Sequence, residues 1–253
     1  YHWDDVAFGG WAIDIHPPQG IDRPDLKPFT PTHVPRLFGI PLRCLISKNI
    51  SNLMFAGRNI SATHVAFAST RVMATCAVMG QAAGTAAALA ARSSLEPAKC
   101  CHDEKFIKTV QQKLLEDDCY VPGVSNQNEC DLARSAKITA SSFRCEGSRP
   151  EEVLSGMTRV ESYGEAPRRL HRWISSPQQL LSHGPARLKL SWENAQQVSQ
   201  IRLVFDTGLH RQVTLSQSDS TTAKSSRGPQ PECVKEYRIL AEDATGNVKQ
   251  IVA

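Results

Sequence analysis

The sequence predicts a mixed α/β region followed by an all-β antiparallel sandwich, and three observations carry that prediction. The short apolar run Leu53–Ala56 ends at Gly57, as a strand buried on both faces of an α/β sheet does. An alanine-rich helix is expected to begin near Val72 and to end near Ala91. From residue 132 onward, apolar and polar residues alternate in short runs separated by Gly, Pro, Asp and Ser, which is typical of antiparallel sandwiches.

These patterns divide the chain into three expected domains. Residues 1–95 form the α/β part, residues 96–131 hold one helix and a linker, and residues 132–253 form the sandwich. Asp103 is expected to cap the helix of the middle part, which should end before Tyr120. The apolar side chains of that helix recur at spacings of three and four: Phe106, Ile107, Val110 and Leu114. The alternating runs of the third part are Leu188–Trp192, Ile201–Phe205 and Val234–Ala241.

Composition excludes several classes of function. The 253 residues carry 29 Lys+Arg against 25 Asp+Glu, a formal net charge of +4, so no nucleic-acid partner is expected. The apolar stretch 72–91 is rich in Ala and Gly and contains Gln81, which favours a buried helix over a membrane span. The eight cysteines include no C-x-x-C pair, so no metal site is expected. The vicinal pair Cys100-Cys101 is interpreted as structural thiols rather than as a redox dyad.

Small residues in the alanine-rich stretch indicate close packing. Gly80 and Gly84 form a G-x-x-x-G pattern, which allows a neighbouring backbone to approach the helix. We therefore interpret both glycines as packing residues. The start of the same helix offers unpaired N–H groups and the positive end of a dipole, which suit an anion or an electron-rich carbonyl.

Three runs in residues 1–95 resemble one family over a long ordered stretch. They are I-P-L-R-C-L-I (40–46), N-L-M-F-A-G-R-N-I-S-A-T-H (52–64) and R-V-M-A-T-C-A-V-M-G-Q-A-A-G-T-A-A-A-L-A (71–90). Together they resemble the C-terminal FAD-binding segment of the FAD-dependent oxidoreductases that include relatives of heterodisulfide reductase. The resemblance implies the C-terminal part of a Rossmann-like FAD-binding domain, with FAD as cofactor.

The resemblance also implies where the cofactor lies. It places Gly57, Arg58 and Ser61 near the sugar-phosphate part of FAD, where Arg58 would neutralise phosphate. It places Arg71, Val72 and Met73 at the helix start, near the flavin O2 that becomes negative on reduction. For Arg58 and Arg71 the alternative is a surface or structural ion pair.

Two histidines are candidate catalytic residues, because transfer of a hydride to flavin from an alcohol or C–H donor needs a base near neutral pH. His64 follows the Gly57 loop, and His16 lies in a stretch that resembles a substrate-side element of the same family. Asp14 either orients His16 or ends a strand. For each histidine the alternative is a structural hydrogen-bonding role.

One family feature does not occur in these residues. A flavoprotein of this build holds the pyrophosphate on a G-x-G-x-x-G turn, and the sequence contains none. We therefore expect that turn to lie upstream, and we expect these residues alone to bind FAD weakly or not at all.

The third part has a resemblance of its own. The stretches 136–142, 153–156 and 171–175 look like a galactose-binding-like, discoidin-type jelly-roll sandwich, which we expect to be truncated after Val252. In that architecture sugars bind on aromatic platforms with polar partners. The candidates here are Trp173 and Trp192, with Arg172, Asp206 and Arg211. The alternative is that both tryptophans fill the core.

The sequence thus predicts a C-terminal fragment of an FAD-dependent oxidoreductase that oxidises a small organic or carbohydrate-type substrate by hydride transfer to flavin. The alternative is a carbohydrate-binding or interaction protein whose flavoprotein-like segment is not catalytic. Analogy with sugar-binding modules favours an extracytoplasmic setting. The sequence names neither the electron acceptor nor the oligomeric state, and it leaves an iron–sulfur cluster outside these residues undecided.

Overall fold

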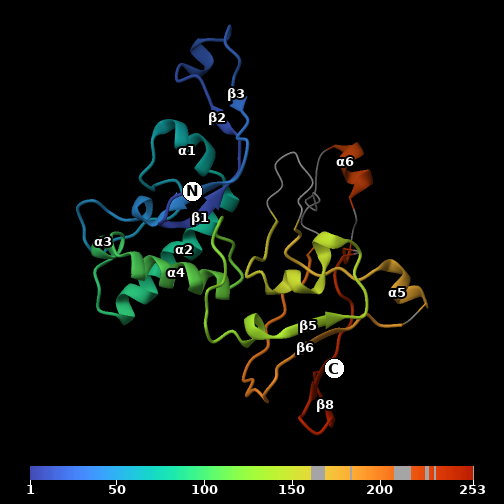
Figure 1. Ribbon diagram of the computed structural model, residues 1–253. Helices are drawn as coiled ribbons and strands as arrows, with labels where there is room; N and C mark the ends of the chain where they lie inside the picture. Colours follow the sequence, from blue (N-terminus) through green and yellow to red (C-terminus); the bar gives the residue numbers. More distant parts are fainter. Residues whose placement is uncertain (161–168, 183, 208–217, 226–227, 231, 253) are drawn as a thin grey trace. The chain divides into compact units, whose positions relative to one another are not determined.

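The computed structural model describes residues 1–160, 169–182, 184–207, 218–225, 228–230 and 232–252. Figure 1 shows the chain coloured along its sequence. Contacts divide the chain into two compact units, Tyr1–Leu190 and Ser191–Ala253.

Two antiparallel strand pairs belong to the first part of the larger unit. Strand β1 (Asp5–Gly9) pairs with β4 (Phe38–Pro41), with a bulge near the start of β1. Strand β2 (Ile13–Ile15) pairs with β3 (Thr30–Thr32) to form a hairpin. The loop of that hairpin holds the 3-10 turn Gly20–Asp22, and a second 3-10 turn, Leu42–Leu45, follows β4.

Four helices follow these strands along the chain. They are α1 (His64–Thr70), α2 (Met73–Arg92), α3 (Pro97–Cys100) and α4 (Glu104–Glu116). The start of α4 confirms the predicted cap, because one carboxylate oxygen of Asp103 accepts hydrogen bonds from the backbone N–H groups of Lys105 and Phe106 at 2.9 and 3.1 Å. All four apolar residues predicted for its inner face are buried.

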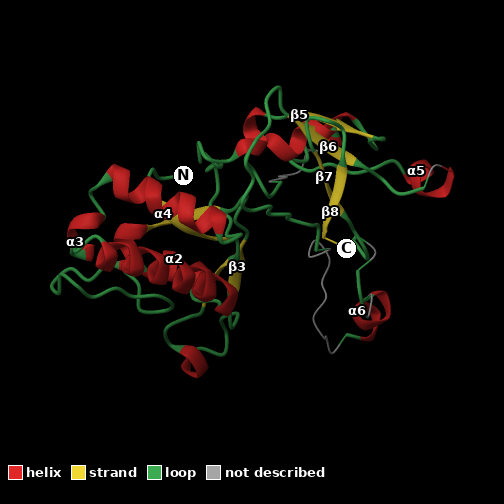
Figure 2. Ribbon diagram, turned by 90° about the horizontal axis from the view of Figure 1, so that it is seen from below, coloured by secondary structure: helices red, strands yellow, loops and turns green. Residues whose placement is uncertain are grey.

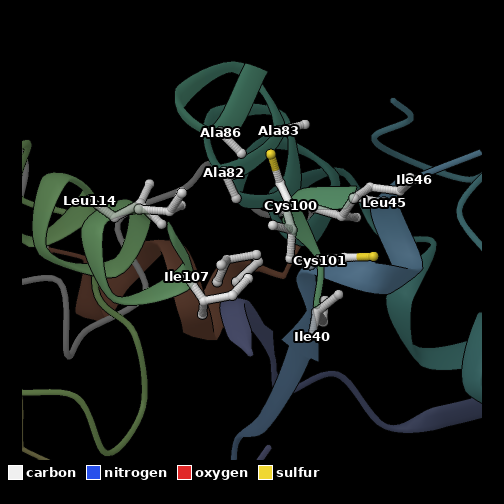
Figure 3. Close-up of a cluster of buried hydrophobic side chains, with 14 of the residues drawn as sticks. Ile40, Leu45, Ile46, Ala82, Ala83, Ala86, Cys100, Cys101, Ile107 and Leu114 are labelled. Atoms are coloured by element: carbon white, nitrogen blue, oxygen red, sulfur yellow. The ribbon is translucent and has the colours of Figure 1, made fainter. Parts of the chain in front are cut away.

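The hydrophobic core lies where α2 and α4 pack together and α2 covers β1 (Figure 2). The alanine face of α2, formed by Ala82, Ala83, Ala86 and Ala90, meets the side chains of α4 and of the segment 40–46 (Figure 3). Cys100 and Cys101 are buried free thiols in this core, and burial raises the pKa of both, as expected for structural cysteines. Gln111 adds a polar link by donating to the backbone oxygens of Trp3 and Asp5.

Helix α2 buries only one of its faces. Gly80 and Gly84 lie on the exposed face, and no described atom comes within 4 Å of the position that a Cβ would occupy at either residue. The prediction that they pack against a neighbouring backbone is wrong for the described residues, because the buried stripe is carried by alanines one and two positions away. By length and composition α2 would suffice to cross a membrane, but its core-packed face makes this weak evidence for a span.

The rest of the chain forms short elements. In the larger unit these are three 3-10 turns (Leu132–Ser135, Glu146–Ser148 and Pro150–Leu154), β5 (Lys137–Ala140) and α5 (Pro177–Ser182). Strand β6 (Leu188–Ser191), at the boundary of the two units, pairs with β5. The smaller unit holds α6 (Asp219–Lys224) and the antiparallel hairpin of β7 (Ile239–Glu242) and β8 (Val248–Val252). In its turn Asp243 accepts hydrogen bonds from Thr245 and Asn247, which lowers the pKa of Asp243 to about 2.

The run Leu53–Ala56 is not the doubly buried strand that the sequence predicts. It is half-buried and forms a single antiparallel bridge, between Met54 and Ile46. The N–H of Phe55 donates to the carbonyl of Leu45 at 2.7 Å. A four-residue apolar run indicates that the segment is shielded from water, but it does not indicate how many strands lie beside it. The mixed α/β character of the N-terminal region is confirmed.

The sandwich prediction is not borne out in the described residues. They form two separate two-stranded sheets, β5–β6 and β7–β8, in the C-terminal part. The run Ile201–Phe205 forms no strand, and all four of its apolar side chains are exposed. Alternation specifies which side chains share a face of a strand, but it does not specify a partner strand.

The inner face of α4 offers a test of the core. Replacing the fully buried Ile107 by Ala should lower the free energy of unfolding by about 3 kcal/mol, because the change removes buried methyl groups and leaves a cavity. The control is Lys108→Ala, one residue on, where the exposed pair with Glu104 contributes about 0.5 kcal/mol or less. Urea unfolding followed by circular dichroism measures both. Equal losses for the two variants would contradict the packing of α4.

Candidate functional site

The junction between α1 and α2 is the centre of the candidate site. Helix α1 is closed by a hydrogen bond from the N–H of Arg71 to the carbonyl of Phe67 at 3.1 Å. Val72 is extended, with φ −72° and ψ 146°, and α2 begins at the next residue without a side-chain cap. The first N–H groups of a 20-residue helix are therefore left for another partner, as the sequence predicts.

The Gly57 loop lies against this helix start. Gly57 has φ +94°, a backbone conformation that side chains disfavour, and a Cβ built on it would lie 3.9 Å from the Sγ of Cys76 in the first turn of α2. The loop is anchored further on by a hydrogen bond from the N–H of Ser61 to the carbonyl of Cys44 at 2.9 Å. Arg58 and Ser61 are exposed between these fixed points.

Helix α1 is not among the elements that the sequence pattern predicts. Its N-cap is Thr63, whose hydroxyl oxygen accepts from the N–H of Ala66 at 3.2 Å, and this Thr was a readable signal. The cap places His64 in the first turn of α1, where it is exposed.

Side chains of the α1–α2 junction donate hydrogen bonds to the β2–β3 hairpin and to the residue Trp11 that precedes it. The hydroxyl of Ser69 donates to the backbone oxygen of Trp11. The Nη2 of Arg71 donates to the backbone oxygen and to Oδ2 of Asp14, both at 3.2 Å. The hairpin and the start of α2 are thus joined through a partly buried ion pair.

The same carboxylate reaches His16. Oδ2 of Asp14 lies 3.3 Å from Nε2 of His16, whose Nδ1 lies 3.0 Å from the backbone oxygen of Pro28. The ring of Phe29 lies 6.1 Å from that of His16, centroid to centroid. Two residues that the sequence singled out separately, Arg71 and His16, therefore meet at Asp14, whereas His64 has no recorded contact with this group in the described structure.

A second charged cluster lies at the start of β1 and has buried carboxylates. Asp4 is fully buried and forms an ion pair with Arg43, while Asp5 accepts from the N–H of His2 at 2.8 Å. The carboxylate of Asp5 lies over Gly39, where any Cβ would collide with it. Burial raises the pKa of Asp5. No motif in the sequence indicates this cluster. Its described contacts are all within the fold, so we interpret it as structural.

The predicted sugar-binding residues are not gathered into a described site. Trp173 is half-buried and donates its Nε1–H to the backbone oxygen of Ser142 at 2.8 Å. Trp192 and Asp206 belong to the other unit, and Arg211 lies outside the described residues.

Beside Trp173, His171 adopts φ +50° and its Nδ1 lies 3.0 Å from the hydroxyl of Ser155. Burial and the nearby Arg169 lower the pKa of His171. The Nε of Arg169 donates to both carboxylate oxygens of Glu152, at 2.9 and 3.1 Å. Among the described residues no group of three His, Cys, Asp or Glu side chains is arranged to hold a metal ion.

Comparison with known proteins gives a family match in the first part of the chain. A model of the family described as FAD dependent oxidoreductase matches residues 2–114. The matched segment runs from before β1 into the last turn of α4 and contains the whole junction described above. Searches among curated proteins and among solved structures gave no significant match. The comparisons lend no support to the narrower likeness to heterodisulfide reductase relatives or to the galactose-binding-like sandwich.

The buried cluster yields a pH prediction. Because the pKa of Asp5 is raised by folding, its stabilising contribution is fully present below the pKa of the unfolded state, near 3.8, and is lost as the pH rises through the folded value. Asp5→Asn keeps an oxygen for the N–H of His2 and carries no charge. It should stabilise the chain by about 1 kcal/mol at pH 7, and the gain should shrink towards pH 4.

Urea midpoints measured across this pH range test the prediction. The control is Asp22→Asn, at an exposed position of the hairpin loop, which should leave the midpoints unchanged. A midpoint for Asp5→Asn equal to or below that of the wild type at pH 7 would show that the Asp5 carboxylate is stabilised where it lies.

Proposed function

We propose that this chain supplies the part of an FAD site that faces the flavin ring, in an oxidoreductase that transfers a hydride between a small organic substrate and the flavin. The observation that carries the proposal is the start of α2, a 20-residue helix with no side-chain cap, inside the segment that matches the family. FAD would supply the hydride acceptor.

The residues present fit an anionic and planar cofactor. The uncapped N–H groups after Val72 suit the flavin O2. The Gly57 turn brings backbone to the same helix end without a side chain between them, and Arg58 is exposed beside it for a phosphate. In this assignment Ser61 provides a hydroxyl on the same loop.

Exposed apolar side chains near the junction add to the fit. Met73 is 89% exposed, Val65 in α1 is 51% exposed, and Trp11, whose backbone oxygen is tied to α1, is 55% exposed. An aromatic ring system laid over such side chains removes them from water.

The guanidinium of Arg71 already has a partner, since it is paired with Asp14. Its charge at the flavin edge is therefore partly balanced, and within the proposal its main role is to fix the hairpin that carries His16. His16 and His64 are the candidates for proton transfer with the substrate. A carbohydrate substrate no longer has support, because it rested on the sandwich.

The test is the product of the complete gene that encodes these residues, purified and scanned in absorbance between about 350 and 500 nm. Bound flavin is expected, and denaturation should release it as FAD. Arg58→Ala should weaken FAD binding about tenfold or more, because a charge-assisted contact to phosphate is lost. The matched control is Arg92→Ala at the exposed far end of α2, which should leave FAD affinity unchanged.

Two outcomes would overturn the proposal. One is a colourless protein that also fails to take up added FAD. The other is an equal loss of affinity in the Arg58 and Arg92 variants, which would show that the Gly57 loop does not contact the cofactor.

A further inference from the structure

The carboxylate of Asp14 contacts two nitrogen-bearing side chains from different parts of the chain. Its Oδ2 lies 3.2 Å from Nη2 of Arg71, at the α1–α2 junction, and 3.3 Å from Nε2 of His16, which follows β2. The Asp14 side chain is only 25% exposed, whereas that of His16 is 53% exposed. The carboxylate is thus held between a fixed arginine and a histidine ring that reaches the surface.

Both ring nitrogens of His16 face oxygen atoms. Nδ1 lies 3.0 Å from the backbone oxygen of Pro28, which can only accept a hydrogen bond. Nε2 faces the Asp14 carboxylate, which also only accepts while it is paired with Arg71. A neutral imidazole carries one N–H and would leave a lone pair against one of these oxygens. Only the imidazolium, with two N–H groups, satisfies both contacts.

We propose that Asp14 is a positioning residue that holds His16 as a doubly hydrogen-bonded imidazolium, with Arg71 tying the pair to the start of α2. The inference deepens the proposed function and rests on it for its catalytic meaning. In this arrangement His16 has no free lone pair and both of its N–H groups are engaged, so it presents a positive charge to the substrate side rather than a base. His16 acts as a base only after it leaves Asp14 or Pro28.

The surroundings of His16 contain the charges that this arrangement needs. Asp14 comes from β2 and Arg71 from the helix junction, and the β3 side contributes the uncharged backbone oxygen of Pro28 and the ring of Phe29. Arg71 and Asp14 balance each other, which leaves the charge of His16 as the net charge of the group. That charge suits a substrate that carries an anionic group near the reacting carbon.

The test is the NMR signal of the histidine ring nitrogens in the 253-residue chain, labelled with ¹⁵N, at pH 7 and without flavin. The wild type should show His16 with two protonated ring nitrogens. Asp14→Asn places an amide N–H in reach of Nε2, so the ring should become neutral with its proton on Nδ1, and one ring ¹⁵N signal should move far downfield. His64, which is exposed on α1, serves as the internal reference.

A matched variant separates positioning from a general loss of charge. Asp25→Asn removes one carboxylate from the same hairpin, but its partner is Arg23 at 2.7 Å, so the His16 signals should not change. The inference is overturned if His16 is neutral in the wild type, or if Asp14→Asn leaves its signals unchanged. The wild-type spectrum can overturn it by itself if the Asp14 variant does not fold.

The result is separable from that of the flavin experiment. An imidazolium at His16 in a protein that never binds FAD would keep the positioning role and overturn the oxidoreductase. A neutral His16 in a protein that holds FAD would overturn the positioning role and keep the oxidoreductase.

Discussion

The burial of one alanine face of α2 is the constraint on which the rest of the first unit depends. Ala82, Ala83 and Ala86 are almost fully buried, and such short side chains allow α4 and β1 to approach the helix closely. A helix held in this way over several turns cannot rotate or slide without opening the core. The position of its first turn is therefore set by contacts far from the candidate site.

That constraint reaches the candidate site through Arg71. The residue stands one position before the extended Val72, so its side chain projects from a point fixed by α2. Arg71 contacts Asp14 in the β2–β3 hairpin, and this contact fixes the hairpin relative to α2. The hairpin needs such a contact because it has only three paired residues on each strand and little core of its own. The hairpin carries His16, and so a surface histidine gains a defined place relative to the helix start.

The sequence predicted the features that depend on local residue spacing, and it did not predict the contacts between residues far apart in the chain. The cap at Asp103 and the buried face of α4 depend on neighbours three and four residues apart, and both are confirmed. The meeting of Asp14 and Arg71 joins residues 57 positions apart, which no periodicity encodes. The predictions of a strand at Leu53–Ala56 and of a sandwich were wrong for the same reason. Alternation and apolar runs indicate which side chains are buried, whereas a sheet also requires a partner strand.

The exposed side chains around the helix start are the strongest physical reason to read the junction as a binding surface. A single exposed methionine such as Met73 is ordinary, because much of any protein surface is apolar. Here it stands at the end of a long helix whose N–H groups have no side-chain cap, beside a glycine turn and an arginine that is exposed. Apolar area, uncapped N–H donors and positive charge in one region are what a planar, anionic ligand requires.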